Sequence, residues 1–120
     1  MKAILLILLI HPELSTIKAA AMRNNCHGED FTLLLAIRKA ENGGSGKEFG
    51  IKHPKAWNTS LDVQAGWAAA TIMQHHKRYP KLKGNDFIIS LANRYCPVLD
   101  DPTGNKNWKK NVIFYFNEMK

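Results

Sequence analysis

The apolar residues of this chain recur at helical spacing rather than in strict alternation. In the run FTLLLAIRKAE, which begins at Phe31, apolar residues stand at i, i+3 and i+4, as on one face of an α-helix. Asp30 precedes the run and is a good N-cap. Gly43 and Gly44 follow it, and glycine accepts the left-handed conformation that closes a helix. The pattern predicts a helix with Glu41 on its last turn.

Three later runs show the same spacing. They cover residues 61–79, 86–95 and about 105–119. Ser60 and Asn85 are the expected caps of the first two, and Pro80 and Pro97 end them because proline cannot continue a helix. Residues 49–57 alternate only weakly, which predicts short irregular or strand-like pieces. The sequence therefore predicts a compact, mainly α-helical domain that contains one irregular segment.

The first ten residues, MKAILLILLI, place one lysine before eight apolar residues. Such a run is long enough for the apolar region of a secretory signal and too short to span a bilayer. Small residues at Ala19–Ala21 suit a cleavage site. The stretch from His11 to Lys18, however, is unusually polar and long for a signal, and the apolar run fits a buried element equally well. We expect residues 1–21 to be a signal or another apolar leader and residues 22–120 to be the domain, exported to the periplasm or the cell exterior.

Charge and composition limit the classes of partner that this chain can bind. A hydrophobic content of 45% in 120 residues suffices for one core, and the net charge of +7 favours an anionic partner such as nucleic acid, anionic lipid or the bacterial cell wall. The basic residues form only short clusters, and no nucleic-acid motif is present. We therefore expect a solvated basic face, no specific nucleic-acid binding and no stable membrane span. The sequence gives no indication of oligomeric state.

The cysteines and histidines do not indicate a metal site. Cys26 and Cys96 match no metal-ligand spacing and are either two free thiols or, in an exported protein, one disulfide. His75 and His76 are adjacent on a predicted helix, so their side chains point about 100° apart and cannot both face one ion. We expect both histidines at the surface or at an interface.

Glu41 is the best candidate for chemistry. A carboxylate at the negative end of a helix dipole, partly buried by apolar neighbours, tends to hold its proton, as a general acid must. The alternative is an ordinary solvated residue of a last helical turn. A second carboxylate is not assigned, since every candidate also suits a first helical turn or a loop; these candidates are Asp62, Asp86, Asp100 and Asp101. Trp57 lies in a predicted loop and is the aromatic residue best suited to contact a ligand.

Five stretches in order resemble the lysozyme-like superfamily, in particular small phage and bacterial lytic transglycosylases. They are AIRKAENGG, FGI, DVQAGWAAATIMQHHKRYP, DFIISLANRYCP and NWKKNVIFYF. The resemblance covers roughly residues 30–119. The resemblance implies that Glu41 is the single general acid and base, that Gly50 and Ile51 line a cleft, and that Tyr95 lies near the glutamate. It also implies peptidoglycan as substrate, cleaved between N-acetylmuramic acid and N-acetylglucosamine without a metal or organic cofactor.

The chain departs from that family pattern at two motifs. Many lytic transglycosylases have Gly-Leu-Met-Gln-Ile and Tyr-Asn-Ala-Gly where this chain has FGIKHP and YCPVLD. Two interpretations follow: a peptidoglycan-cleaving glycosidase, by hydrolysis or transglycosylation, or a non-catalytic lysozyme-like protein that is part of a phage or binds the cell wall.

Overall fold

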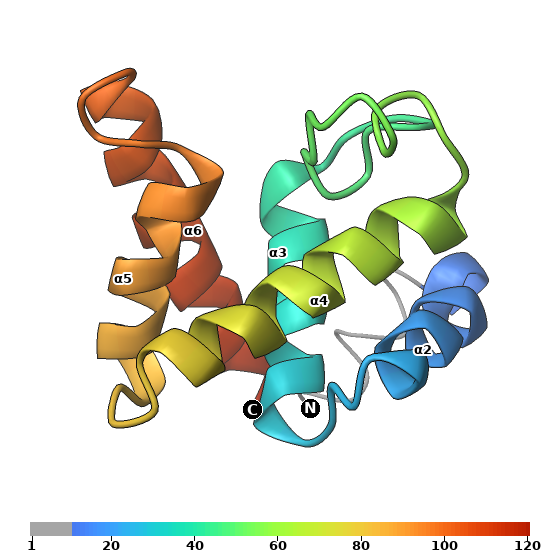
Figure 1. Ribbon diagram of the computed structural model, residues 1–120, viewed down its shortest axis with the longest axis horizontal. Helices are drawn as coiled ribbons and strands as arrows, with labels where there is room; N and C mark the ends of the chain where they lie inside the picture. Colours follow the sequence, from blue (N-terminus) through green and yellow to red (C-terminus); the bar gives the residue numbers. More distant parts are fainter. Residues whose placement is uncertain (1–10) are drawn as a thin grey trace.

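The structure is a computed structural model that describes residues 11–120. In this range the chain forms a short 3-10 turn, η1 (His11–Glu13), five α-helices and no strand (Figure 1). The α-helices are α2 (Leu14–Arg23), α3 (Glu29–Glu41), α4 (Leu61–Arg78), α5 (Gly84–Tyr95) and α6 (Pro102–Met119). The predicted mainly α-helical architecture is confirmed. Residues 42–60 contain only turns and irregular structure, so the strand-like pieces expected there are not formed.

The helices pack around α3. Helix α6 lies against α3, α5 against α6, and α4 against both α3 and α2, while the irregular segment 42–60 covers one end of α3 and α4 (Figure 1). Five consecutive residues of α3, Leu33 to Ile37, are buried. Five consecutive residues cover more than one full helical turn, so the middle of α3 is enclosed by neighbours on several sides.

Helix α2 belongs to the same core. Ile17 and Ala20 are fully buried and Ala21 almost so, and the helix packs mainly on α4. The predicted domain start at residue 22 therefore falls inside a packed helix. The apolar run 1–10 lies outside the described residues, and signal cleavage stays a prediction. No helix in residues 11–120 has the length and apolar character needed to cross a membrane.

The helix caps agree with the sequence in part. Ser60 caps α4 as predicted, since its hydroxyl accepts from Val63 N at 3.3 Å. Gly28 holds the N-cap position of α3, which leaves Asp30 inside the first turn. Asn42 rather than a glycine takes the left-handed conformation after α3, with φ +47°; asparagine tolerates this region better than most residues.

The last two helices begin earlier than predicted. Helix α5 starts at Gly84 after Lys83, so Asn85 lies within its first turn. Helix α6 starts at Pro102 because Asp101 caps it, its carboxylate accepting from Gly104 N at 2.9 Å. Proline at the first helical position lacks only an N–H that would have no helical partner.

Cys26 and Cys96 are both free thiols, so the disulfide alternative is not formed.

His75 is buried rather than exposed, being 2% accessible, with Nε2 2.9 Å from the hydroxyl of Ser90. His76 instead turns to Asp30, with 2.6 Å between Nε2 and Oδ1. The two rings diverge as their helical spacing predicts. Within residues 11–120 no group of three or more His, Cys, Asp and Glu side chains is arranged to hold a metal.

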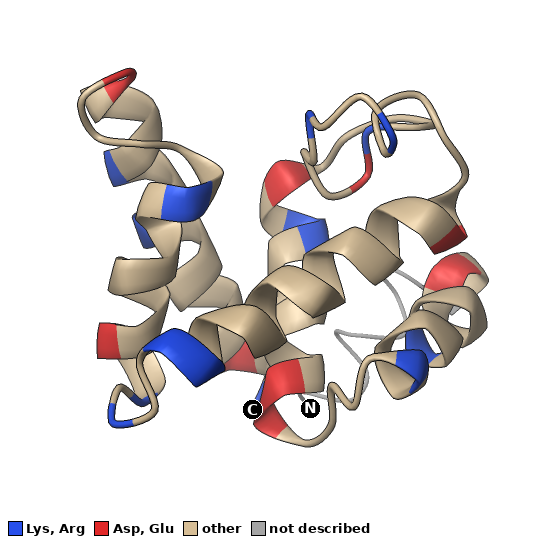
Figure 2. Ribbon diagram, in the orientation of Figure 1, with Lys and Arg blue, Asp and Glu red and all other residues tan. Residues whose placement is uncertain are grey.

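Charged residues are distributed over all the helices. Figure 2 shows Lys and Arg on each helix and in the irregular segment, interspersed with acidic residues and without a continuous basic stripe in this view. This distribution agrees with a solvated basic surface.

Candidate active site

Glu41 is the last residue of α3, and its carboxylate is held by a side chain from α6. Trp108 Nε1 donates to Glu41 Oε2 at 3.0 Å. These two residues are 67 positions apart, and the packing of α6 on α3 brings them together. Trp108 itself is 8% exposed, and a buried indole N–H generally finds an acceptor. The contact therefore satisfies the indole and orients the carboxyl group.

The surroundings of Glu41 favour its protonated form. Burial raises the pKa of the carboxyl above its ordinary value, and this effect outweighs two opposing ones, the hydrogen bond from Trp108 and the charge of Lys52. A carboxyl group with a raised pKa keeps its proton to a higher pH than an ordinary carboxyl group, which suits it to act as a general acid. Once it has done so, Trp108 and Lys52 stabilise the carboxylate that remains.

Gly50 provides the wall on which the Glu41 carboxyl rests. Its φ is +67°, and a Cβ at this position would lie 2.6 Å from the carboxyl carbon of Glu41. Only glycine allows both the left-handed backbone and this approach. The glycines directly after the helix behave differently: Gly43 packs on the backbone of Lys47, and Gly44 has open space around its Cα.

Gln64 holds the segment that carries Gly50. This side chain is fully buried on α4. Its Oε1 accepts from Phe49 N at 3.2 Å and Ile51 N at 3.3 Å, and its Nε2 donates to Ile51 O at 3.0 Å and Ala56 O at 2.9 Å. One amide side chain thus replaces the backbone partners that this irregular segment lacks.

Arg38 fixes the first half of the same irregular segment. Its guanidinium makes two bonds to the Glu13 carboxylate, at 2.7 and 2.9 Å, and donates to Gly43 O at 3.1 Å and Glu48 O at 3.3 Å. The side chain of Arg38 is only 14% exposed. A fork of donors matches a carboxylate and carbonyls at once, so Arg38 ties η1 to the backbone that follows Glu41.

A pocket of about 400 Å³ opens in front of Glu41. Of the five residues proposed as site residues, Glu41, Gly50, Trp57 and Tyr95 line it, and Ile51 lines an adjoining pocket of about 360 Å³. The fold thus brings together all five, from α3, the irregular segment and α5. Among the described residues that line the larger of these two pockets, Glu41 is the sole carboxylate.

Tyr95 and Trp57 contribute aromatic walls to this pocket. The ring of Tyr95 stacks on Trp108 with 5.0 Å between centroids, and its buried hydroxyl has no hydrogen-bond partner. Burial, together with the nearby charge of Glu41, raises the pKa of that hydroxyl, which stays neutral. Trp57 is half-buried and has Lys47 Nζ 5.2 Å from its ring centre.

Three residues of the site were missed as functional residues in the sequence. Trp108 lies among the buried residues of α6, and the signal available in the sequence was the need of a buried indole for an acceptor. Gln64 interrupts an otherwise apolar helix face, which indicates a buried polar role. Lys52 has no local signal. The candidate second carboxylates lie elsewhere: Asp62 pairs with Arg23 at 2.6 Å, and none of the four lines the pocket of Glu41.

Comparisons were made with protein-family models, with curated proteins and with solved structures, and none of the three gives a match to this chain.

Proposed function

We propose that the protein is a peptidoglycan-cleaving glycosidase in which Glu41 is the single general acid and base. The observation that carries this proposal is a half-buried carboxyl with a raised pKa, hydrogen-bonded to Trp108 at 3.0 Å, at the wall of a pocket. Protonation of a glycosidic oxygen requires a carboxyl group that has its proton, and a raised pKa extends the pH range in which Glu41 has it. The resemblance of residues 30–119 to the lysozyme-like superfamily supplies the substrate class.

The reaction needs one proton donor that later becomes a base. Glu41 gives its proton to the oxygen that joins N-acetylmuramic acid to N-acetylglucosamine as that C–O bond breaks. The resulting carboxylate then removes a proton from one of two nucleophiles. If this is the muramoyl 6-hydroxyl, its oxygen bonds to C1 of the same N-acetylmuramic acid and closes an anhydro ring. If it is water, the water oxygen bonds to that C1 instead. Either step returns the proton to Glu41. The positively charged Lys47 and Lys52 at the same pocket suit an anionic wall polymer.

The site is compatible with a one-carboxylate mechanism. Most glycosidases use two carboxylates at a defined separation, whereas the pocket of Glu41 has one among the described residues. An enzyme of this kind meets its substrate at the cell wall, so the protein would act after export or as part of a phage particle. No metal or organic cofactor has a part in the reaction as proposed.

The test is release of muropeptides from purified sacculi by the whole protein. Glu41→Gln removes the proton donor but keeps the shape and the acceptor for Trp108, and we expect release to fall by at least about a hundredfold while co-sedimentation with sacculi is retained. The matched control is Glu118→Gln, which makes the same change at an exposed residue of α6 and should leave release unchanged.

The same experiment separates the second interpretation. A wild-type protein that co-sediments with sacculi but releases no muropeptide would be the non-catalytic wall-binding protein. Equal release by wild type and Glu41→Gln would remove Glu41 from the mechanism.

A further inference from the structure

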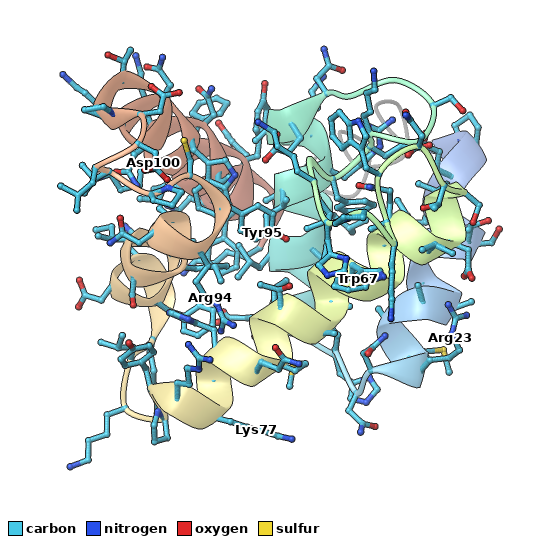
Figure 3. All side chains as sticks on the ribbon, turned by 45° about the horizontal axis from the view of Figure 1, so that its top comes forward. Arg23, Trp67, Lys77, Arg94, Tyr95 and Asp100 are labelled. Atoms are coloured by element: carbon cyan, nitrogen blue, oxygen red, sulfur yellow. The ribbon has the colours of Figure 1, made fainter. Side chains whose placement is uncertain are left out.

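Two further pockets continue the line that starts at Glu41. The pocket of about 360 Å³ shares Gly50, Lys52 and Tyr95 with the pocket of Glu41. It also shares Thr71 and Arg94 with a third pocket, of about 630 Å³, that extends along α4. Figure 3 shows Tyr95, Arg94 and Trp67 along this side of the molecule. We call the second and third pockets together the α4–α5 groove.

Arg94 stands at the junction of the two pockets and has no partner in the part of the chain that the structure describes. Its Nη1 is buried and has no hydrogen bond, and within residues 11–120 it takes part in no ion pair. Arg23 and Arg38, by contrast, each contact a carboxylate, at 2.6 and 2.7 Å. A guanidinium is always charged, and a buried charged donor without an acceptor is costly. An acceptor supplied by a ligand would remove that cost.

The charge around Arg94 is not compensated by the protein. The ionisable residues of the second pocket, besides Arg94 and Tyr95, are Lys52 and His53. The third pocket contains Asp62, but this carboxylate is paired with Arg23 at 2.6 Å. The junction is therefore positive and suits an anionic group, and a planar guanidinium matches a carboxylate with two parallel hydrogen bonds.

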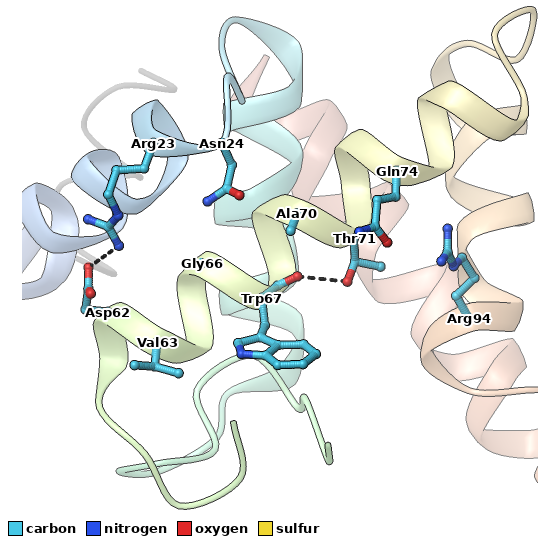
Figure 4. Close-up of a pocket in the computed structure, with 10 residues that line it drawn as sticks. All are labelled: Arg23, Asn24, Asp62, Val63, Gly66, Trp67, Ala70, Thr71, Gln74 and Arg94. Atoms are coloured by element: carbon cyan, nitrogen blue, oxygen red, sulfur yellow. Dashed lines mark hydrogen bonds and ion pairs between the residues drawn. The ribbon is translucent and has the colours of Figure 1, made fainter. Parts of the chain in front are cut away.

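An aromatic ring and two polar side chains line the same pocket as Arg94. Figure 4 shows Arg94 reaching from α5 toward Gln74 and Thr71 of α4, with Trp67 one helical turn before Thr71. The Trp67 ring is half-buried and stacks on His53, with 4.5 Å between centroids. Trp67 and its neighbours offer a flat apolar surface with hydrogen-bonding groups at its edge, which is the chemistry that binds a sugar ring.

We propose that the α4–α5 groove is a binding site for an acidic sugar, in which Arg94 binds the carboxylate and Trp67 packs against the ring. The site requires binding alone, so it stands whether or not Glu41 acts as an acid. It also gives a reason for a half-buried arginine that lines the same pocket as an aromatic residue and whose buried Nη1 has no partner within residues 11–120.

The test compares two monosaccharides that differ in one carboxylate. N-acetylmuramic acid is N-acetylglucosamine with a lactyl group on O3, and neither contains a bond for Glu41 to cleave. Binding to the whole wild-type protein is followed by NMR, through the indole N–H of Trp67 and the Nε–H of Arg94. We expect N-acetylmuramic acid to bind about tenfold more tightly and to shift both signals.

Variants identify the carboxylate contact. Arg94→Gln should abolish the preference, and Arg94→Lys, which keeps the charge without the planar fork, should retain part of it. Arg78→Gln makes the same charge change at an exposed residue outside both pockets and should keep the full preference. Trp67→Ala should weaken binding of both sugars.

Three results would overturn the proposal. The first is equal affinity of the wild-type protein for both sugars, a result that does not depend on whether any variant folds. The second is a preference that survives in a folded Arg94→Gln protein. The third is a shift of Arg94 by inorganic phosphate but not by N-acetylmuramic acid, which would make the site one for phosphate.

Discussion

Replacement of Gln64 by leucine tests whether one buried side chain organises the irregular segment above the site. The two residues are similar in size, so the variant keeps the packing of α4 and removes the four hydrogen bonds to residues 49–56. Ala56 O keeps a bond from Thr59 N at 3.1 Å. Three groups are then left without a partner among the described residues: the carbonyl of Ile51 and the N–H groups of Phe49 and Ile51. The two N–H donors carry most of the cost, because an unpaired buried N–H is tolerated less well than an unpaired C=O.

The expected cost follows from these two groups. An orphaned buried donor costs about 1–3 kcal/mol, and the Ile51 N–H is partly accessible to water. The free energy of unfolding should fall by about 2–4 kcal/mol in Gln64→Leu, a large share of the roughly 5–15 kcal/mol typical of a domain. The backbone order around Gly50 should also decrease, because Gly50 lies between Phe49 and Ile51, whose amides lose their bonds to Gln64.

Urea denaturation measures the loss, and hydrogen exchange locates it. The amides of Phe49 and Ile51 should lose protection in Gln64→Leu, while amides in the middle of α3 keep theirs. Gln74→Leu is the control, because Gln74 is an exposed residue of the same helix and the change should stay within about 0.5 kcal/mol. Equal stability of the two variants, with unchanged exchange at Phe49 and Ile51, would refute this account of the segment.

Three further outcomes test the site. Burial raises the pKa of Glu41, so the contribution of this group to folding stability is fully present below the ordinary carboxyl pKa and is lost as pH rises through the raised pKa. Glu41→Gln should therefore be more stable than wild type at pH 7 and equal to it near pH 3. Urea denaturation that gives the same stability difference between the two proteins at both pH values would contradict this. Gly50→Ala should lower stability by about 2 kcal/mol or more, whereas Gly44→Ala, in open space, should not, and thermal melts that coincide would argue against the close approach. Burial raises the pKa of Cys26 to about 12, so at pH 8 Ellman's reagent should label Cys96 well before Cys26; equal rates would mean that Cys26 is accessible.

The local elements of this fold were predictable because their signals are local. Apolar residues at i, i+3 and i+4 placed α3, α4 and most of α5 and α6. Ser60 marked the start of α4 because its hydroxyl can accept from a free N–H of the first turn. Pro97 marked the end of α5 because proline has no N–H to continue the helical hydrogen bonds. Helix α2 was missed as part of the core, since a short alanine-rich helix next to an apolar run has the composition of a leader.

The candidate site was predictable only residue by residue. Glu41 was found from its position at a helix end, and Trp57 from its place in a loop. The raised pKa of Glu41, however, comes chiefly from burial, which depends on where α6 and the irregular segment lie.

By itself the sequence determined a mainly helical chain and the acid at the end of one helix, because both follow from neighbours within about two turns. Tertiary structure alone decided that Trp108 donates to Glu41 from 67 residues away and that Gln64 holds the backbone around Gly50. It also decided that the buried Nη1 of Arg94 has no partner within residues 11–120. These contacts depend on how the helices pack, and packing is a property of the whole core rather than of any local pattern.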